Sequence, residues 1–70
     1  MSFAICLSNE GYAASLEKRK LYALIPDAKA AEKGFVRIID ESGEDYLYPA
    51  RFFAAIPLPH ELEEAIEHAA

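Results

Sequence analysis

The sequence predicts a mainly β domain of five short strands, with short helical turns between strands and an α-helix at the C-terminus. Three observations lead to this fold class. Short apolar stretches alternate with residues that favour turns, as in small all-β proteins. Residues 35–48 have the pattern of two strands joined by a tight turn, and the residues after Pro59 follow a helical period. A chain of 70 residues has room for one such domain.

Two strands are expected in the N-terminal part of the chain. Phe3–Ser8 alternates with the period of a strand, and residues 9–11 (Asn-Glu-Gly) favour a turn after it. Tyr12–Glu17 fits either a long loop or one helical turn, and we treat it as an excursion between strands. Lys20–Ile25 predicts a second strand, which is central in the sheet because both of its faces are apolar.

A short helical turn is expected after the second strand. Pro26 ends that strand, and the Asp27 carboxylate is suited to cap the helix that follows. Ala28–Lys33 forms the helical turn, and Gly34 ends it as a left-handed residue. A helix of this length is not stable alone, so we expect it to lean on the sheet.

The stretch Phe35–Tyr48 predicts a β-hairpin with a three-residue loop, Glu41–Gly43. Asp40 can accept hydrogen bonds from backbone N–H groups ahead of it, and Gly43 tolerates the positive φ of a bulge. The expected cross-strand pairs are Asp40 with Glu44, Ile39 with Asp45, Ile38 with Tyr46, Arg37 with Leu47 and Val36 with Tyr48. One face is assigned to the core, with Val36, Ile38, Tyr46 and Tyr48. The opposite face, with Arg37, Ile39 and Leu47, needs a cover.

The last part of the chain predicts a strand and then a helix. Pro49 has no N–H to donate and interrupts the ladder, and Ala50–Phe53 predicts a 3₁₀ turn that places one Phe in the core. Ala54–Leu58 predicts the last strand. The helix after Pro59 has one apolar stripe, which consists of Leu62, Ala65, Ile66 and Ala69. We therefore divide the chain into a β domain, residues 1–58, and an amphipathic helix, residues 59–70, that packs on the domain or on a partner.

Several turn and core residues carry a resemblance to a known group of proteins. They are Lys20, Tyr22 and Leu24, then Ile39–Glu44, Tyr46, Tyr48 and Pro49, and finally Phe52. These residues resemble small bacterial SH3-like proteins of unassigned function, and the resemblance covers about residues 18–58. It implies a five-stranded SH3-like small barrel and no particular activity. The chain contains no Trp, unlike the polyproline-binding SH3 domains of eukaryotes.

Composition restricts the classes of partner. Acidic residues outnumber basic residues by 12 to 7, which disfavours nucleic acid because neutralisation of phosphates supplies most of that affinity. The single cysteine, Cys6, lies between apolar neighbours and is expected to be a buried structural thiol. No apolar run approaches about 18 residues, and the first residues lack the pattern of a signal peptide. We therefore expect a soluble cytoplasmic protein that is not in a membrane.

The function that we predict is that of a non-catalytic protein-interaction module. No Ser, Cys or carboxylate has a convincing partner for a catalytic triad, and no glycine-rich phosphate loop is present, so we expect neither an enzyme nor a cofactor. The expected partner is another protein or a second copy of the chain. The candidate protein-binding residues are Tyr12, Tyr22, Arg37, Ile39, Leu47, Leu62 and Ile66.

A nucleic-acid-associated barrel is the alternative interpretation. Residues 18–20 (Lys-Arg-Lys) are the only basic cluster, which could contact a phosphate backbone or could be the exposed start of a strand. The candidate anion-binding residues are Lys18, Arg19, Lys20 and Arg51.

Two clusters contain residue types that bind metals, and we interpret both as solvated surface. One consists of His60, Glu64 and His68 at helical spacing, which are suitable zinc ligands but also typical of a polar helix face. The other consists of Glu41, Glu44 and Asp45, which could hold a hard cation but which also suit an open turn. We therefore predict no metal site.

Overall fold

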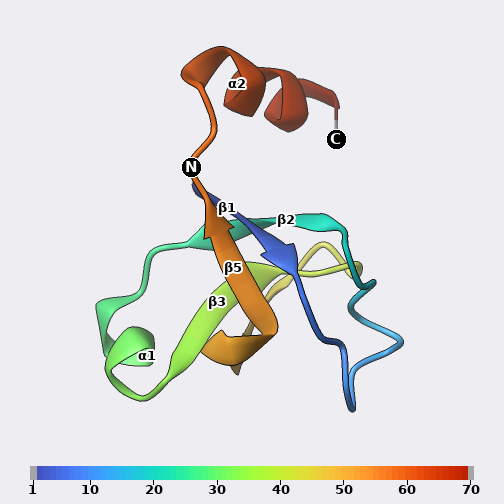
Figure 1. The fold of residues 1–70 in the computed structure, drawn as a ribbon, viewed down its shortest axis with the longest axis vertical. Coiled ribbons are helices and arrows are strands. Elements are labelled where there is room, and N and C mark those ends of the chain that lie inside the picture. The colour runs from blue at the N-terminus through green and yellow to red at the C-terminus, as the bar shows by residue number, and fades with distance from the viewer. Residues whose placement is uncertain (1, 70) are drawn as a thin grey trace.

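The computed structural model describes residues 2–69, without the side chains of residues 63 and 67–69. Its elements are β1 (Ser2–Cys6), β2 (Leu21–Ile25), α1 (Ala28–Glu32), β3 (Phe35–Ile39), β4 (Asp45–Pro49), the 3₁₀ helix η1 (Ala50–Phe52), β5 (Phe53–Ile56) and α2 (His60–Ala69). Within residues 2–69 the five strands form one antiparallel sheet in the order β4-β3-β2-β1-β5 (Figure 1). The prediction of a mainly β chain with a central second strand is confirmed. Nowhere in the described part of the chain is there a helix with the length and apolar character needed to cross a bilayer.

The hairpin of β3 and β4 has the predicted register. Arg37 lies opposite Leu47, and Val36 lies opposite Tyr48. The Asp40 N–H donates to Glu44 O at 3.1 Å, and the Gly43 N–H donates back to Asp40 O at 3.0 Å. Gly43 has φ of +85°, a conformation that residues with a Cβ rarely adopt. The turn residues therefore set the register, as their chemistry predicts.

The inner face of the curved sheet encloses the core. The buried members of the core are Ala4, Cys6, Leu16, Tyr22, Ile38, Tyr48, Phe52 and Phe53, with Leu24 and Val36 packed against them. Both Phe52 and Phe53 are buried, although the sequence predicted only one Phe inside. The Cys6 thiol is fully buried, as expected.

Tyr46 is the error in the predicted core, because 51% of its surface is exposed. It lies on β4, which is an edge strand, so a neighbouring strand shields it on one side only. Its hydroxyl donates to the Glu44 carboxylate at 3.0 Å, which is a surface contact. The predicted pairing of Tyr46 with Ile38 is therefore confirmed, but a cross-strand pair does not by itself bury both side chains.

Leu16 takes a core position that the sequence did not indicate. It comes from the long connection between β1 and β2 and is only 1% exposed. The Asn9 side chain donates to Leu16 O at 3.1 Å, and the Glu41 N–H donates to Ser15 O at 3.0 Å. The first bond lies within the connection, and the second holds the connection against the hairpin loop, so the connection covers one end of the core.

Local chemistry sets the short helices as expected. The Asp27 carboxylate caps α1 by accepting from the Ala30 N–H at 3.0 Å, and Gly34 follows with φ of +80°. The last strand is shifted from its predicted range, since β5 begins at Phe53 and ends at Ile56. Its start is set by η1, which ends one residue before it.

Candidate protein-binding surface

The outer face of the sheet is mainly apolar on β1, β2 and β5 and carries Arg37 on β3, whereas a sheet face that no second layer covers is commonly polar. The register places Phe3 between Ala23 on β2 and Ile56 on β5, all with side chains on this face. Other members of this face are Ile5, Leu21, Ile25, Ala54 and Ile39. We call it the outer face.

A hollow of about 560 Å³ lies between the outer face and α2. Its apolar lining consists of Phe3, Leu21, Tyr22, Ala23, Ile39 and Ile66. Its charged lining consists of Lys20, Asp40 and Glu41. Among the α2 side chains that the structure describes, Ile66 lines the hollow. The hollow therefore brings three predicted binding residues, Tyr22, Ile39 and Ile66, to one place.

Helix α2 is set apart from the strands, and the ribbon shows it above the sheet at the end of an extended segment (Figure 1). That segment, residues 57–59, has the sequence Pro-Leu-Pro, in which each Pro restricts φ and favours an extended chain. Leu62 is 47% exposed, whereas Ile66 is half-buried. The apolar stripe of α2 is thus only partly covered by its own chain. Ala69, the fourth residue of the predicted stripe, has its side chain outside the described residues.

Arg37, Leu47 and Tyr12 do not line this hollow, although Arg37 and Leu47 lie on the same outer face of the sheet. Arg37 is engaged in ion pairs with Asp27 at 3.0 Å and Asp45 at 2.8 Å. Leu47 lines a separate, smaller depression beside α1 and Arg37. Tyr12 is exposed at its rim but packs edge-on against Tyr48, with ring centroids 5.0 Å apart.

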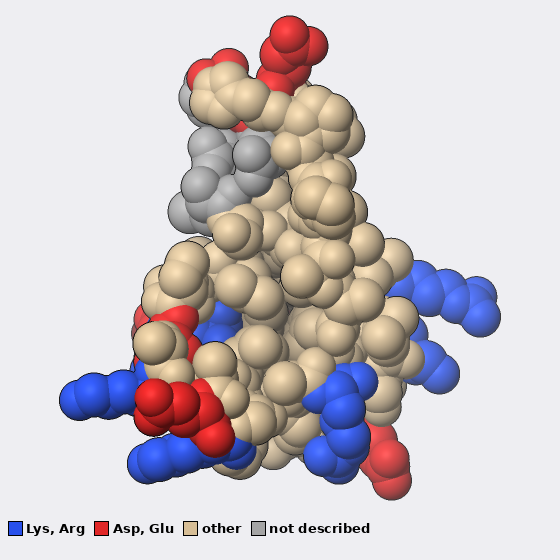
Figure 2. Space-filling model, turned by 60° about the vertical axis from the view of Figure 1, so that its left-hand side comes forward, with Lys and Arg blue, Asp and Glu red and all other residues tan. Residues whose placement is uncertain are grey.

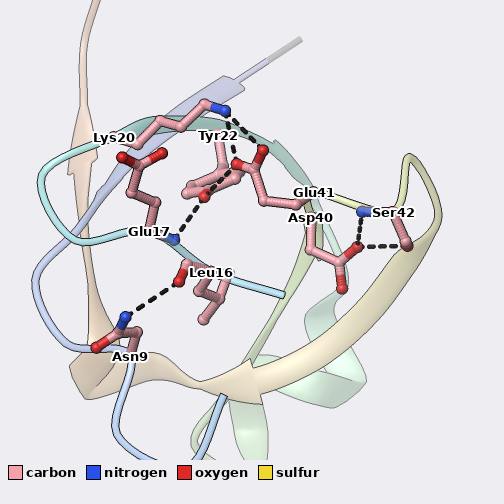
Figure 3. A network of polar contacts seen from close by, with 8 residues as sticks. All are labelled: Asn9, Leu16, Glu17, Lys20, Tyr22, Asp40, Glu41 and Ser42. Carbon is pink, nitrogen blue, oxygen red and sulfur yellow. Dashed lines mark hydrogen bonds and ion pairs between the residues drawn. The ribbon is translucent and has the colours of Figure 1, made fainter. Parts of the chain in front are cut away.

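Tyr22 requires a correction, because it is 5% exposed and offers almost no area to a partner. Its hydroxyl accepts from the Glu17 N–H at 2.8 Å and donates to the Glu41 carboxylate at 2.5 Å (Figure 3). Burial and the bond to Glu41 raise the pKa of Tyr22 well above its ordinary value. Tyr22 is therefore a core residue that ties the hairpin loop to β2.

The basic cluster is partly neutralised within the chain. The Lys20 ammonium lies 2.6 Å from a Glu41 carboxylate oxygen, and the bond from Lys20, followed by that from Tyr22, lowers the pKa of Glu41 (Figure 3). Arg51 lies over the Phe52 ring, 5.2 Å from its centroid, on η1. Lys18 and Arg19 are exposed, and Arg19 has a positive φ of 69°.

The acidic residues at the hairpin tip each have a local contact. Glu41 binds Lys20 and Tyr22, Glu44 accepts from Tyr46, and Asp45 pairs with Arg37. On α2, His60 Nε2 lies 3.1 Å from Glu64 Oε1, and the His68 side chain lies outside the described residues. Among the side chains that are described, no three metal-binding groups converge.

Comparison with known proteins adds no relative: no family model, no curated protein and no solved structure matches this chain. The hollow therefore has to be interpreted from its own chemistry. Sequence reasoning found Ile39 and Ile66 but not Phe3, Leu21 and Ala23 as parts of one surface. The available signal was that both faces of the first two strands are apolar.

Proposed function

We propose that this chain is a small SH3-like barrel that serves as a non-catalytic protein-interaction module. The barrel part of the proposal is supported by the strand order, in which β1 to β4 are successive neighbours, β5 returns to β1, and a 3₁₀ turn precedes β5. The interaction part rests on one observation, the apolar hollow between the outer face and α2.

The size and lining of the hollow suit an apolar side chain of a protein partner. A volume of about 560 Å³ accommodates several side chains, and its walls are mainly aliphatic and aromatic. Burial of one Leu or Ile side chain contributes about 1.5–3 kcal/mol, so two or three anchors would support a specific complex. The Lys20–Glu41 ion pair at the border supplies polar groups that orient such a partner.

The test is capture of partners from a nuclease-treated native lysate by the wild-type chain and three variants, read by mass spectrometry. Ile39→Asp and Ile66→Asp place a charge on opposite walls of the hollow. Leu7→Asp makes the same chemical change at an exposed leucine that does not line the hollow. We expect a protein retained by wild type and by Leu7→Asp but lost by both hollow variants.

Circular dichroism of each variant must first show an intact sheet. A partner that all the folded variants retain equally would show that the hollow is not the binding surface. Including Leu47→Asp tests for a second site, because loss with that variant alone would place binding in one of the two hollows that Leu47 lines, beside Arg37 and α1 or beside Tyr12 and Ser42.

A further inference from the structure

Another hollow, of about 540 Å³, lies between the β1–β2 connection and the hairpin of β3 and β4. We call it the tyrosine hollow, because its lining includes Tyr12, Tyr46 and Tyr48, together with Asp40, Glu41 and Ser42. It shares the two carboxylates with the hollow at the outer face but none of the apolar residues. Among the residues that the structure describes, no Lys, Arg or His lines it.

The three tyrosines differ in depth. Tyr48 is buried and forms the floor, whereas Tyr12 and Tyr46 are exposed and form the rim. The rings of Tyr12 and Tyr48 stand at 86°, with centroids 5.0 Å apart, so they make a corner and not a flat stack. Aromatic rings attract cations, because their faces carry negative charge.

Two of these rings are polarised by carboxylates. The Tyr48 hydroxyl donates to Asp40 Oδ2 at 2.6 Å, and the Tyr46 hydroxyl donates to Glu44 Oε2 at 3.0 Å. A phenol that donates to a carboxylate gains negative charge on its oxygen and ring, which strengthens its attraction for a cation. The bond to Glu44, followed by the charges of Glu44 and Asp40, raises the pKa of Tyr46, so the rim of the tyrosine hollow is at negative potential.

The negative charge at the tip of the hairpin is only half compensated. Residues 40–45 contain four carboxylates, those of Asp40, Glu41, Glu44 and Asp45. Lys20, which does not line the tyrosine hollow, pairs with Glu41. Arg37 pairs with Asp45 and is shared with Asp27. Two of the four carboxylates, those of Asp40 and Glu44, are therefore left without a cation among the described side chains.

This imbalance is local. In the view of Figure 2, acidic side chains of the sheet part are interspersed with Lys and Arg side chains. The hydrogen-bond donors to Asp40 and Glu44 are all neutral: the Ser42 N–H and the hydroxyls of Ser42, Tyr46 and Tyr48. Neutral donors stabilise a carboxylate but leave its charge in place, so a cation that enters the tyrosine hollow is attracted.

We propose that the tyrosine hollow binds a cationic side chain, Arg or Lys, of a protein partner. The rings of Tyr12 and Tyr46 contact the apolar stem and the cation, while Asp40 acts through its charge from beneath them. A cation that leaves water needs an opposite charge to offset its lost hydration, and Asp40 and Glu44 supply it. This inference goes beyond the proposed function, because it assigns a second surface and the charge of the group that this surface takes.

NMR titration of the full chain with three capped peptides tests the charge. The peptides are acetyl-Gly-Arg-Gly-amide, its Lys analogue and its citrulline analogue, which keeps the shape of Arg without the charge. We expect the Arg and Lys peptides to shift the ring resonances of Tyr12 and Tyr46 with a Kd in the millimolar range. The citrulline peptide should bind about fivefold or more weakly. Equal binding of the citrulline peptide, or no shift up to about 50 mM of the charged peptides, would overturn the proposal.

Variants at exposed positions test the residues without disturbing the core. Tyr46→Leu removes a ring at the rim and should weaken binding of the Arg peptide by about threefold or more, whereas Tyr46→Phe keeps the ring and should retain most of the binding. Glu44→Gln should weaken it by about twofold, and the same change at an exposed carboxylate of α2, Glu61→Gln, should not. If Tyr46→Leu binds the Arg peptide as tightly as wild type, the proposal is wrong.

The failure of this proposal differs from that of the proposed function. Ile66 lines the outer-face hollow and not the tyrosine hollow, so Ile66→Ala should leave binding of the Arg peptide unchanged. A chain that binds neither charged peptide, but captures a partner that Ile39→Asp loses, would retain the interaction module and exclude the tyrosine hollow. A chain that binds the Arg peptide but captures no such partner would do the reverse.

Discussion

At the scale of single residues, the buried carboxylate of Asp40 links the hairpin loop to β4 through hydrogen bonds. Asp40 is 6% exposed and accepts hydrogen bonds from the Ser42 N–H, the Ser42 hydroxyl and the Tyr48 hydroxyl. Burial alone would raise the pKa of Asp40, but the bonds from Ser42 and Tyr48 outweigh it and lower that pKa. The carboxylate thus stays charged inside the fold because three donors replace its water.

Removal of one hydrogen-bond donor to Asp40 should lower the free energy of unfolding. Tyr48→Phe keeps the packed ring but removes the hydroxyl that lies 2.6 Å from Asp40 Oδ2. We expect a loss of about 1–3 kcal/mol in the free energy of unfolding, measured by urea denaturation. Tyr46→Phe is the matched control, since its hydroxyl makes a surface bond to Glu44, and it should change stability by less than about 0.5 kcal/mol. Equal effects of the two variants would contradict this role for Asp40.

The same groups predict how stability depends on pH. The folded-state pKa values of Asp40 and Glu41 lie below their ordinary values of 3.8 and 4.5. Their contribution is therefore complete above pH 4.5 and is lost as the pH falls below the ordinary values and through the lowered ones. The urea concentration at the midpoint of unfolding, measured from pH 7 to pH 2.5, should decrease mainly at pH values below about 4.5. The fall should be smaller in Asp40→Asn, and a decline that is complete above pH 5 would contradict the assignment.

At the scale of elements, the hairpin and α2 represent two kinds of structure. The hairpin is determined by its own turn, in which Gly43 has φ of +85° and open space where a Cβ would lie. Helix α2 follows Pro59, and its Ile66 lines the hollow together with residues of β1, β2 and β3. One element is therefore stable through local bonds, and the other depends on contacts made at a distance.

Gly43 gives the test at this scale. Gly43→Ala should reduce stability by about 1–2 kcal/mol, because a Cβ at positive φ strains the backbone even where space is free. Gly43→Asn should cost less, since Asn tolerates the left-handed conformation. Thermal unfolding of the two variants measures the difference. A larger loss with Asn than with Ala would indicate that side-chain crowding, and not φ, decides this position.

At the scale of the whole molecule, net charge separates the two classes of partner. The chain carries a net charge of −5, and Lys20 of its basic cluster is engaged by Glu41. Of that cluster, Lys18 and Arg19 then remain exposed for a phosphate backbone, whose binding depends on several unneutralised cations. The apolar hollow does not depend on net charge and remains the better-supported surface.

Fluorescence anisotropy with labelled single-stranded and double-stranded DNA tests this separation. We expect no binding at about 200 mM salt, and at most weak binding at about 50 mM that Lys18→Glu with Arg19→Glu abolishes. The Leu62→Asp variant is the control, since it leaves the basic cluster intact. Binding of wild type that survives 200 mM salt would favour the nucleic-acid-associated barrel over the interaction module.

Local chemistry made much of the fold predictable. The Asp27 cap, Gly34 and the Asp40–Gly43 turn each act over three or four residues, and their positions were correctly predicted. The hairpin register followed, because the loop length sets which residues face each other. In the candidate site, Ile39 and Ile66 could be found because apolar residues on a mixed face and on a helical stripe need cover.

Neighbouring residues were thus enough to indicate five strands and the hairpin register, since each of these depends on short stretches of chain, but the first and last strands end earlier than predicted, at Cys6 and Ile56. Which side chains are buried was settled only in three dimensions: Tyr46 is exposed at a sheet edge, Tyr22 is buried beside the hairpin loop that its hydroxyl binds, and Leu16 enters the core from a long connection. A period of two assigns a residue to one of two faces, but burial depends on what packs against that face. The pairing of β5 with β1 and the position of α2 bring together residues that are far apart in the chain. A pattern within a short stretch of sequence does not predict which distant stretch it will contact.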